Sequence, residues 1–437
     1  MAVRPETEIN KAVNEVHTGS LLAVASAGDL VWCPESETGR LTSHASASQL
    51  QEVSSEDDEP SQQEDKDSEI NADILQSYHH LQTVAESQLR SFKGRITSQM
   101  LYLPRRQSSP QPPSTPVALE EGVKGQKLRI YAVTWNMHGK LPTEMGRLLP
   151  VHPAPHIYVV ASQECMRSIS KSLVVQSKEQ WETRLARTLG SDYVMLRSHT
   201  MVAIHLAVFI HTSLQPIVSA IRSADIGTGW AKQGNKGAVA VSCQVGATSL
   251  LCVCCHLTSG QNSIKRRNLD FDRINRELRL NEETSPLTES FDAVVWLGDL
   301  NYRINGPKAS VEMLIAQGQL GVLLESDQLG LERRHARLPG DLLEGEIRFQ
   351  PTYRFDHGTD TYDTSRKQRV PSWCDRILYR SRKNGLKLVQ YSSLMDLRLS
   401  DHKPVFAHFE LTFVTAESEV AAEPLSQSKK SSVCLVF

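Results

Sequence analysis

The segment AVVWLGDLNYR, residues 293–303, joins an apolar run to polar side chains that follow it at once. The apolar run predicts a buried strand over residues 293–297. Gly298 and Asp299 come directly after it, so a carboxylate is expected at the end of a rigid element. Side chains that a scaffold holds in this way often bind ligands or catalyse reactions. The segment therefore predicts a layered α/β fold with a functional carboxylate at a sheet edge.

Other strands and helices can be read on both sides of this segment. Strands are predicted at residues 128–135, 157–161, 206–211, 238–245, 249–256 and 404–412. Helical periodicity appears at residues 179–189, 264–280 and 310–324. Together they predict one large α/β domain over residues 127–413, a length that a single domain accommodates.

The first 120 residues have a different composition from this domain. They carry 18 Asp and Glu against 9 Lys and Arg, and residues 51–70 alone hold nine acidic side chains. Such a region buries too little apolar area to offset its ordering entropy, so residues 1–120 are predicted to be largely disordered. The exception is residues 73–92, where Ile74, Tyr78, Leu81 and Leu89 have roughly helical spacing. This helix is expected either to dock on the domain or on a partner, or to stay solvated.

A Pro- and Ser-rich segment, residues 104–116, contains two P-x-x-P patterns. It predicts an extended linker, or a ligand for the aromatic groove of an SH3-type partner. Residues 1–120 carry a net charge of −9 and the whole chain carries −2, so residues 121–437 carry +7 and are mildly basic. This excess suits an anionic substrate but is too weak to indicate nucleic acid, so no nucleic-acid partner is expected.

Composition also excludes several classes of protein. The eight cysteines are scattered along the chain, which indicates reduced thiols and an intracellular protein. The charged N-terminus does not resemble a secretory signal, and no apolar run reaches the length of a membrane span. The C-x-x-C-H pattern at residues 252–256 lies in a strand-like run with no second Cys/His pair, so neither haem nor zinc is expected.

Polar side chains of catalytic type recur beside the predicted strands. They are Asn136, Glu164, Asn235, Lys236, His256, Asp299, Asn301, Asp375, Asp401 and His402. Each alone is ordinary turn or cap chemistry. Together they supply the carboxylates, amides, imidazoles and ammonium group that metal-assisted phosphate hydrolysis requires.

Two of the motifs resemble those of the inositol polyphosphate 5-phosphatases, members of the endonuclease/exonuclease/phosphatase superfamily related to DNase I. They are WLGDLNYR at residues 296–303 and PSWCDRIL at residues 371–378. The resemblance spans residues 127–413 and implies a DNase I-like four-layer sandwich, with two mixed sheets between helices. It also implies Mg²⁺-dependent hydrolysis of the 5-phosphate of membrane phosphoinositides by in-line attack of an activated water. Phosphatidylinositol 4,5-bisphosphate and 3,4,5-trisphosphate are the expected substrates.

The same resemblance assigns the metal site and the water. Glu164 and Asn136 would hold Mg²⁺, a hard cation that prefers oxygen ligands. Asp299, helped by Asn301, would orient and deprotonate the attacking water.

Charge stabilisation falls to the histidines in this reading. His256 would donate a hydrogen bond to the scissile phosphate. His402, held by Asp375, would stabilise charge from the other side, because a carboxylate favours the protonated imidazole. Asp401 would help to position the water or the metal.

The resemblance also assigns substrate selection. One set of residues would bind the 4-phosphate of the inositol ring, and a second set would lie beneath the 5-phosphate that is hydrolysed. They are Tyr353, Arg354, Lys367 and Arg369 for the 4-phosphate, and Asn235 and Lys236 for the floor of the site. A solvated basic face is the alternative for residues 366–369.

The tail, residues 414–437, is predicted to be flexible and ends in Cys434-Leu435-Val436-Phe437, a C-a-a-X motif that favours geranylgeranylation of Cys434. Prenylation would place the chain at the cytoplasmic face of a membrane and give it a prenyl-binding protein as a partner. This tail and other segments resemble the prenylated type IV branch, which suggests the Golgi or the cilium. A monomer is expected.

Two rival functions follow from the same sequence. A nuclease or sphingomyelinase of the superfamily would share the metal and histidine machinery. A prenylated scaffold with an inactive domain would bind phosphoinositides without turnover.

Overall fold

The computed structural model describes residues 61–95, 126–143, 145–165, 174–229, 236–281, 285–339 and 341–414. All of them belong to the second of two compact units, residues 60–437. The predictions for Asn235, Cys434 and residues 104–116 fall outside the described residues.

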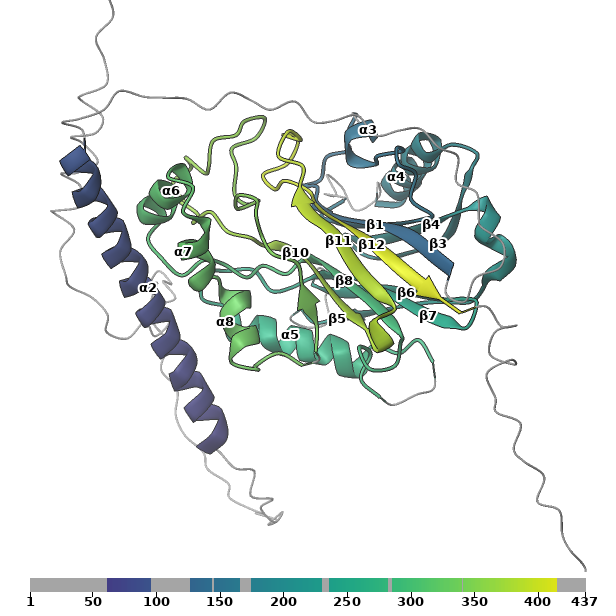
Figure 1. Cartoon of the computed structure of the whole chain (residues 1–437), viewed down its shortest axis with the longest axis horizontal. Coiled ribbons are helices and arrows are strands. Elements are labelled where there is room, and N and C mark those ends of the chain that lie inside the picture. The colour runs from purple at the N-terminus through teal and green to yellow at the C-terminus, as the bar shows by residue number, and fades with distance from the viewer. Residues whose placement is uncertain are drawn as a thin grey trace, which may run out of the picture. The chain divides into compact units, whose positions relative to one another are not determined.

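Two six-stranded sheets form the domain (Figure 1). The first has the order β11 (Leu386–Ser393), β12 (Val405–Phe413), β1 (Gln126–Asn136), β2 (Ile157–Gln163), β4 (Ile204–His211) and β3 (Tyr193–Met201). The second has the order β5 (Val218–Gly227), β6 (Gly237–Val245), β7 (Thr248–His256), β8 (Ala293–Asp299), β10 (Asp375–Ser381) and β9 (Leu343–Glu344). Both sheets are mixed, because β1 runs parallel to β2 and β7 to β8 while their other pairings are antiparallel.

Alternating side chains assign each strand face to a different apolar layer. In β8, Val295 and Leu297 belong to a cluster shared with residues of the first sheet such as Val159, whereas Val294 and Trp296 belong to a second cluster. The shared cluster is therefore the layer between the two sheets.

Helices cover the two outer faces. Helix α5 (Ile264–Glu277) stacks Phe271 on Trp296 of the second sheet. On the first sheet, α3 (Met145–Leu148) and α4 (Val174–Leu189) contribute Leu148 and Leu185 to the cluster that contains Tyr131. The predicted four-layer sandwich is confirmed.

The helix predicted over residues 310–324 is wrong in extent. The structure has two helices there, α6 (Lys308–Ala316) and α7 (Leu320–Glu325), followed by α8 (Gln328–Arg334). The break lies at Gly318, whose φ of +70° cannot continue a right-handed helix. None of the described helices combines the length and the hydropathy that crossing a membrane demands.

The N-terminal helix is longer than predicted and is docked. Helix α2 runs over Ser61–Arg95, so residues 61–70, predicted to be disordered, are helical. Ile70 and Leu81 are buried, and the helix packs on α6, α7 and the segment that contains Gly306. Tyr78, predicted to share the apolar face, is 42% exposed.

Candidate active site

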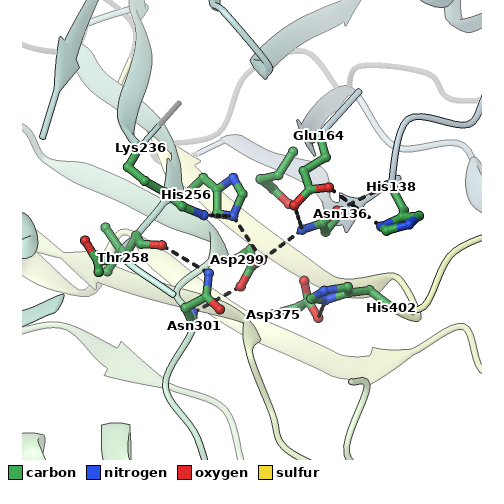
Figure 2. A network of polar contacts seen from close by, with 12 residues as sticks. Asn136, His138, Glu164, Lys236, His256, Thr258, Asp299, Asn301, Asp375 and His402 are labelled. Carbon is green, nitrogen blue, oxygen red and sulfur yellow. Dashed lines mark hydrogen bonds and ion pairs between the residues drawn. The ribbon is translucent and has the colours of Figure 1, made fainter. Parts of the chain in front are cut away.

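Most of the polar residues predicted from the sequence meet at one end of the two sheets (Figure 2), namely Asn136, Glu164, Lys236, His256, Asp299, Asn301, Asp375 and His402. Strand register explains much of this convergence, because Asp299 at the end of β8 has His256 of β7 and Asp375 of β10 as its cross-strand neighbours. In the first sheet, Asn136 ends β1 beside Gln163, the residue before Glu164. Carboxyl ends of parallel strands share one edge, so both sheets present their functional side chains together.

Asp299 lies at the centre of the group and is buried. Its Oδ2 accepts a hydrogen bond from Asn136 Nδ2 at 2.9 Å, and its Oδ1 accepts one from the backbone N–H of Asn301 at 3.1 Å. Burial would raise the pKa of this carboxyl, but the contact with His256 and the charges of His402 and Lys236 hold the pKa well below its usual range. Asp299 is therefore ionised at neutral pH.

The oxygen atoms around Asn136 fit a hard divalent cation. Asn136 Nδ2 lies 3.5 Å from Glu164 Oε1 as well as 2.9 Å from Asp299 Oδ2, so one amide spans two carboxylates. The Glu164 side chain is 31% exposed, which leaves room for the waters that such a cation keeps. The predicted metal residues Glu164 and Asn136 are thus brought together, next to the predicted catalytic carboxylate.

Lys236 and His256 lie on the other side of Asp299. The Lys236 Nζ atom contacts His256 Nε2, which in turn lies 3.3 Å from Asp299 Oδ2. Burial lowers the pKa of Lys236 to about 8, although the carboxylates of Asp299 and Glu164 oppose the change. Burial, with the nearby Lys236 charge, also lowers the pKa of His256, so the cation on this side is mainly the lysine. The buried His256 Nδ1 atom has no partner among the described residues.

His402 and Asp375 form a buried pair. His402 Nδ1 lies 2.9 Å from Asp375 Oδ2, which also accepts a hydrogen bond from the Thr352 hydroxyl. Burial opposes protonation of His402, but the attraction of Asp375 outweighs it and raises the pKa of the imidazole to about 9. His402 therefore carries a positive charge at neutral pH.

Asp401 contacts the rim rather than the centre of the group. Its Oδ1 lies 3.3 Å from His138 Nδ1 and its Oδ2 lies 3.4 Å from Arg354 Nε. Burial would raise the pKa of Asp401, yet the neighbouring His402, His138 and Arg354 lower it. Its carboxylate thus orients basic side chains beside the site.

The predicted substrate-binding residues differ in how near they lie to the group around Asp299 and His402. The Tyr353 ring packs on the His402 ring, with centroids 4.5 Å apart, and Arg354 is held by Asp401. The backbone N–H of Arg369 donates to the Asp363 carboxylate, and the backbone N–H of Asp363 donates to the Arg354 carbonyl. Within the described ranges, no hydrogen bond or ion pair joins the side chains of Lys367 or Arg369 to the catalytic group.

Two functional side chains were not assigned from the sequence. His138 lies between Glu164 and Asp401, with Nδ1 3.7 Å from Glu164 Oε2. Arg303 is buried with its guanidinium 4.2 Å from the Tyr353 ring centroid and hydrogen-bonded to Asn301 Oδ1. Arg303 ends the recognised WLGDLNYR motif, and His138 follows Asn136 by two positions, so proximity to motif residues was the available signal.

The model of endonuclease/exonuclease/phosphatase family 2 matches residues 133–408. Human phosphatidylinositol polyphosphate 5-phosphatase type IV is 35% identical over 306 residues, which are 65% of this chain and 46% of that protein. Mouse type II inositol 1,4,5-trisphosphate 5-phosphatase is 32% identical over 320 residues, 70% of this chain and 32% of that protein. The chain thus spans less than half of the length of these relatives.

Solved structures agree. The inositol polyphosphate 5-phosphatase domain of SPsynaptojanin, in complex with inositol (1,4)-bisphosphate and a calcium ion, superposes with a TM-score of 0.63 at 34% identity. The match covers 68% of this chain and 88% of that domain. A Cimex nitrophorin, at 23% identity and a TM-score of 0.55, shares the fold. The chain therefore belongs to endonuclease/exonuclease/phosphatase family 2, and the inositol polyphosphate 5-phosphatases are its relatives.

Proposed function

We propose that this chain hydrolyses the 5-phosphate of membrane phosphoinositides such as phosphatidylinositol 4,5-bisphosphate and 3,4,5-trisphosphate, with Mg²⁺ as its cofactor. The observation that carries the proposal is the convergence of Asn136, Glu164, His256, Asp375 and His402 around the ionised Asp299. The names of the relatives and the calcium ion of the synaptojanin domain support the reaction and the need for a divalent cation.

Glu164 would hold the cation through a carboxylate oxygen. Asn136 would bind it through Oδ1, after a turn of the amide group, since Nδ2 faces the carboxylates and Oδ1 accepts the His138 backbone N–H in this structure. Bound there, Mg²⁺ supplies positive charge that offsets the charge of the phosphate.

The remaining side chains act on water and phosphate. Asp299 accepts a hydrogen bond from the attacking water, with Asn301 fixing the carboxylate through its backbone N–H. The water oxygen forms a bond to phosphorus as the bond to the ring oxygen breaks. Asp299 accepts the proton that the water loses, and the ring oxygen leaves as a hydroxyl after it takes up a proton from solvent. Charge on the phosphate is stabilised by Lys236 on one side and by protonated His402 on the other.

Selectivity for the 5-position would come from the ring phosphate beside it. Tyr353 and Arg354 lie next to His402 and Asp401, where they can grip a 4-phosphate while the 5-phosphate reaches Asp299. Lys367 and Arg369 would extend this grip, and Asn235 would complete the floor with Lys236. Holding one phosphate in this way places the other in line for attack.

The test is phosphate release from short-chain phosphatidylinositol 4,5-bisphosphate with Mg²⁺, scored by which ring phosphate is lost. The wild-type chain should remove the 5-phosphate, and Asp299→Ala should abolish turnover while retaining lipid binding. Abasic DNA and sphingomyelin serve as rival substrates. Cleavage of either without phosphate release, or equal turnover by wild type and Asp299→Ala, would contradict the proposal.

Attachment to the cytoplasmic face of a membrane, at the Golgi or the cilium, is proposed from the sequence alone. A prenyl group on Cys434 would supply it and would engage a prenyl-binding protein, while residues 104–116 would bind an SH3-type partner. Cys434→Ser should keep activity on short-chain substrate and lose membrane association on fractionation. Unchanged membrane association would refute the anchor.

A further inference from the structure

Helix α2 contacts the segment that leads away from the catalytic carboxylate. Leu81 of α2 is completely buried and belongs to the same apolar cluster as Ile304 and Val311. Its Cδ1 atom lies against Gly306, where a Cβ added to the glycine would be 2.7 Å away. Only seven positions separate Gly306 from Asp299 in the chain. The helix therefore packs directly on the segment that follows Asp299, residues 300–306.

Polar contacts fix the helix at two further places. The Ser326 hydroxyl donates to the backbone carbonyl of Ser77 at 3.4 Å. Asp73 Oδ2 accepts a hydrogen bond from the Arg337 guanidinium at 2.7 Å and lies 3.0 Å from His335 Nδ1. Burial would lower the pKa of Arg337, but Asp73 and Glu332 raise it, so this anchor is ionic at neutral pH.

A continuous set of buried contacts joins this helix to Asp299. Ser326, which touches α2, accepts a hydrogen bond from the backbone N–H of Asn305 at 3.0 Å. Gln328 Nε2 donates a hydrogen bond to Asn305 Oδ1 at 2.7 Å, and Gln328 Oε1 accepts one from the backbone N–H of Arg303 at 2.9 Å.

The last link of this set lies inside the site. Arg303 donates from Nε to the Asn301 carbonyl at 3.0 Å and from its terminal nitrogen to Asn301 Oδ1. Asn301 in turn donates to Asp299. Since these groups are buried, solvent cannot replace their contacts if the segment shifts.

We propose that α2 is a positioning element of the active site, in which Leu81 holds residues 301–306 so that Asn301 and Arg303 stay fixed around Asp299. No described side chain of α2 hydrogen-bonds to the catalytic group, so the helix acts through other residues. The inference rests on the proposed function, because its kinetic readout is release of the 5-phosphate.

The test uses the full chain with three variants of α2. Leu81→Ala is expected to lower kcat about 10-fold, since small misplacements of reacting groups are costly, with KM changed by less than about twofold. Leu81→Met, which refills the space, should restore kcat. Leu75→Ala is the matched control, because Leu75 lies on the same helix but is 62% exposed. Hydrogen–deuterium exchange of the amides of residues 301–306 should accelerate in Leu81→Ala alone.

Unchanged kcat in folded Leu81→Ala overturns the proposal, even if the melting temperature falls, because the helix then only stabilises the domain. Should Leu81→Ala fail to fold, Asp73→Asn loosens the helix at Arg337 and His335 while leaving the apolar contact intact. A few-fold lower kcat, with faster exchange at 301–306, is expected from it, and wild-type values would overturn the proposal. If the wild-type chain releases no phosphate, the proposed function fails, and the exchange comparison alone decides whether α2 orders residues 301–306.

Discussion

His402 and Asp375 share a buried contact of 2.9 Å between Nδ1 and Oδ2, and this contact keeps the imidazole protonated with a pKa of about 9. The two residues come from different segments, since Asp375 is the first residue of β10 and His402 lies three residues before the start of β12. Asp299, whose register neighbour is Asp375, lies close to both. A positive charge is thereby fixed at neutral pH opposite Lys236, across the carboxylate of Asp299.

Replacing Asp375 by Asn should remove the source of that charge. We expect kcat for phosphate release to fall about 10²-fold or more, as when one preorganised electrostatic group is lost from an active site. The measurement is steady-state kinetics on short-chain substrate. Asp396→Asn, at a carboxylate that is 83% exposed, is the control and should behave as wild type. Equal losses in both variants would argue against a specific role for the pair.

The pH profile should report the same pair. Lys236, with a pKa of about 8, and His402, with a pKa of about 9, both stabilise the phosphate as cations, so wild-type activity should decline as pH rises through this range. In Asp375→Asn the pKa of His402 falls, so the decline should begin at lower pH. Folding raises the pKa of His402, so its protonation also stabilises the folded state. This contribution is fully present below pH 6.5, the ordinary pKa of histidine, and is lost as the pH rises through about 9, the pKa in the folded protein. Melting temperatures across this window should therefore fall more in wild type than in the variant. Identical profiles would contradict the assignment.

Divalent-cation dependence should follow Glu164. Chelation should abolish turnover and added Mg²⁺ should restore it, because the oxygen atoms around Asn136 suit a hard cation. Glu164→Gln should need about 10²-fold more Mg²⁺ for half-maximal activity, since it loses the charged ligand. Glu277→Gln in α5, at a side chain that is 55% exposed, is the control. An unchanged Mg²⁺ requirement in Glu164→Gln would place the cation elsewhere, for example at the acidic group of Asp299 and Asp375.

Much of this site could be predicted because its residues follow short apolar runs. Asp299 and His256 end buried strands whose periodicity is plain in the sequence, and the strand ends bring them together. Asp375 and His402 were paired by resemblance, since nothing in local spacing reveals a contact across 27 positions.

Other features depend on tertiary context and escaped prediction. The strands β3, β5 and β11 lie at sheet edges, and their mixed polar and apolar residues give no buried-strand pattern. The role of Arg303 follows from burial against Tyr353, which its own segment does not show. Leu81 was predicted to lie on a helix, but its partner Gly306 is distant in sequence.

Arg354 should set substrate preference rather than the rate of chemistry. Its guanidinium is oriented by Asp401 at 3.4 Å and is partly exposed, so a ring phosphate can reach it. Arg354→Met should raise KM for phosphatidylinositol 4,5-bisphosphate about 10- to 100-fold, the range for one lost charged hydrogen bond, with a smaller effect on kcat. Arg348→Met, at an exposed arginine, is the control. A substrate that lacks the 4-phosphate should be hydrolysed equally by wild type and Arg354→Met, and a loss on it would contradict the assignment.

Gly298 should be irreplaceable for a purely steric reason, which affects folding rather than catalysis. The residue has a φ of +147°, and a Cβ added there would overlap the backbone carbonyl oxygen of Cys255 in the neighbouring strand β7. The overlap is with backbone, so relief requires β7 and β8 to separate at the register that sets His256 beside Asp299. We expect Gly298→Ala to lower the free energy of unfolding by about 4 kcal/mol or more, or to prevent folding, as seen for the most damaging core changes. Gly146→Ala in α3 meets no atom within 4 Å and should stay within about 1 kcal/mol of wild type in the same denaturation experiment. A Gly298→Ala protein with wild-type stability would show that the two strands tolerate a wider separation than their pairing indicates.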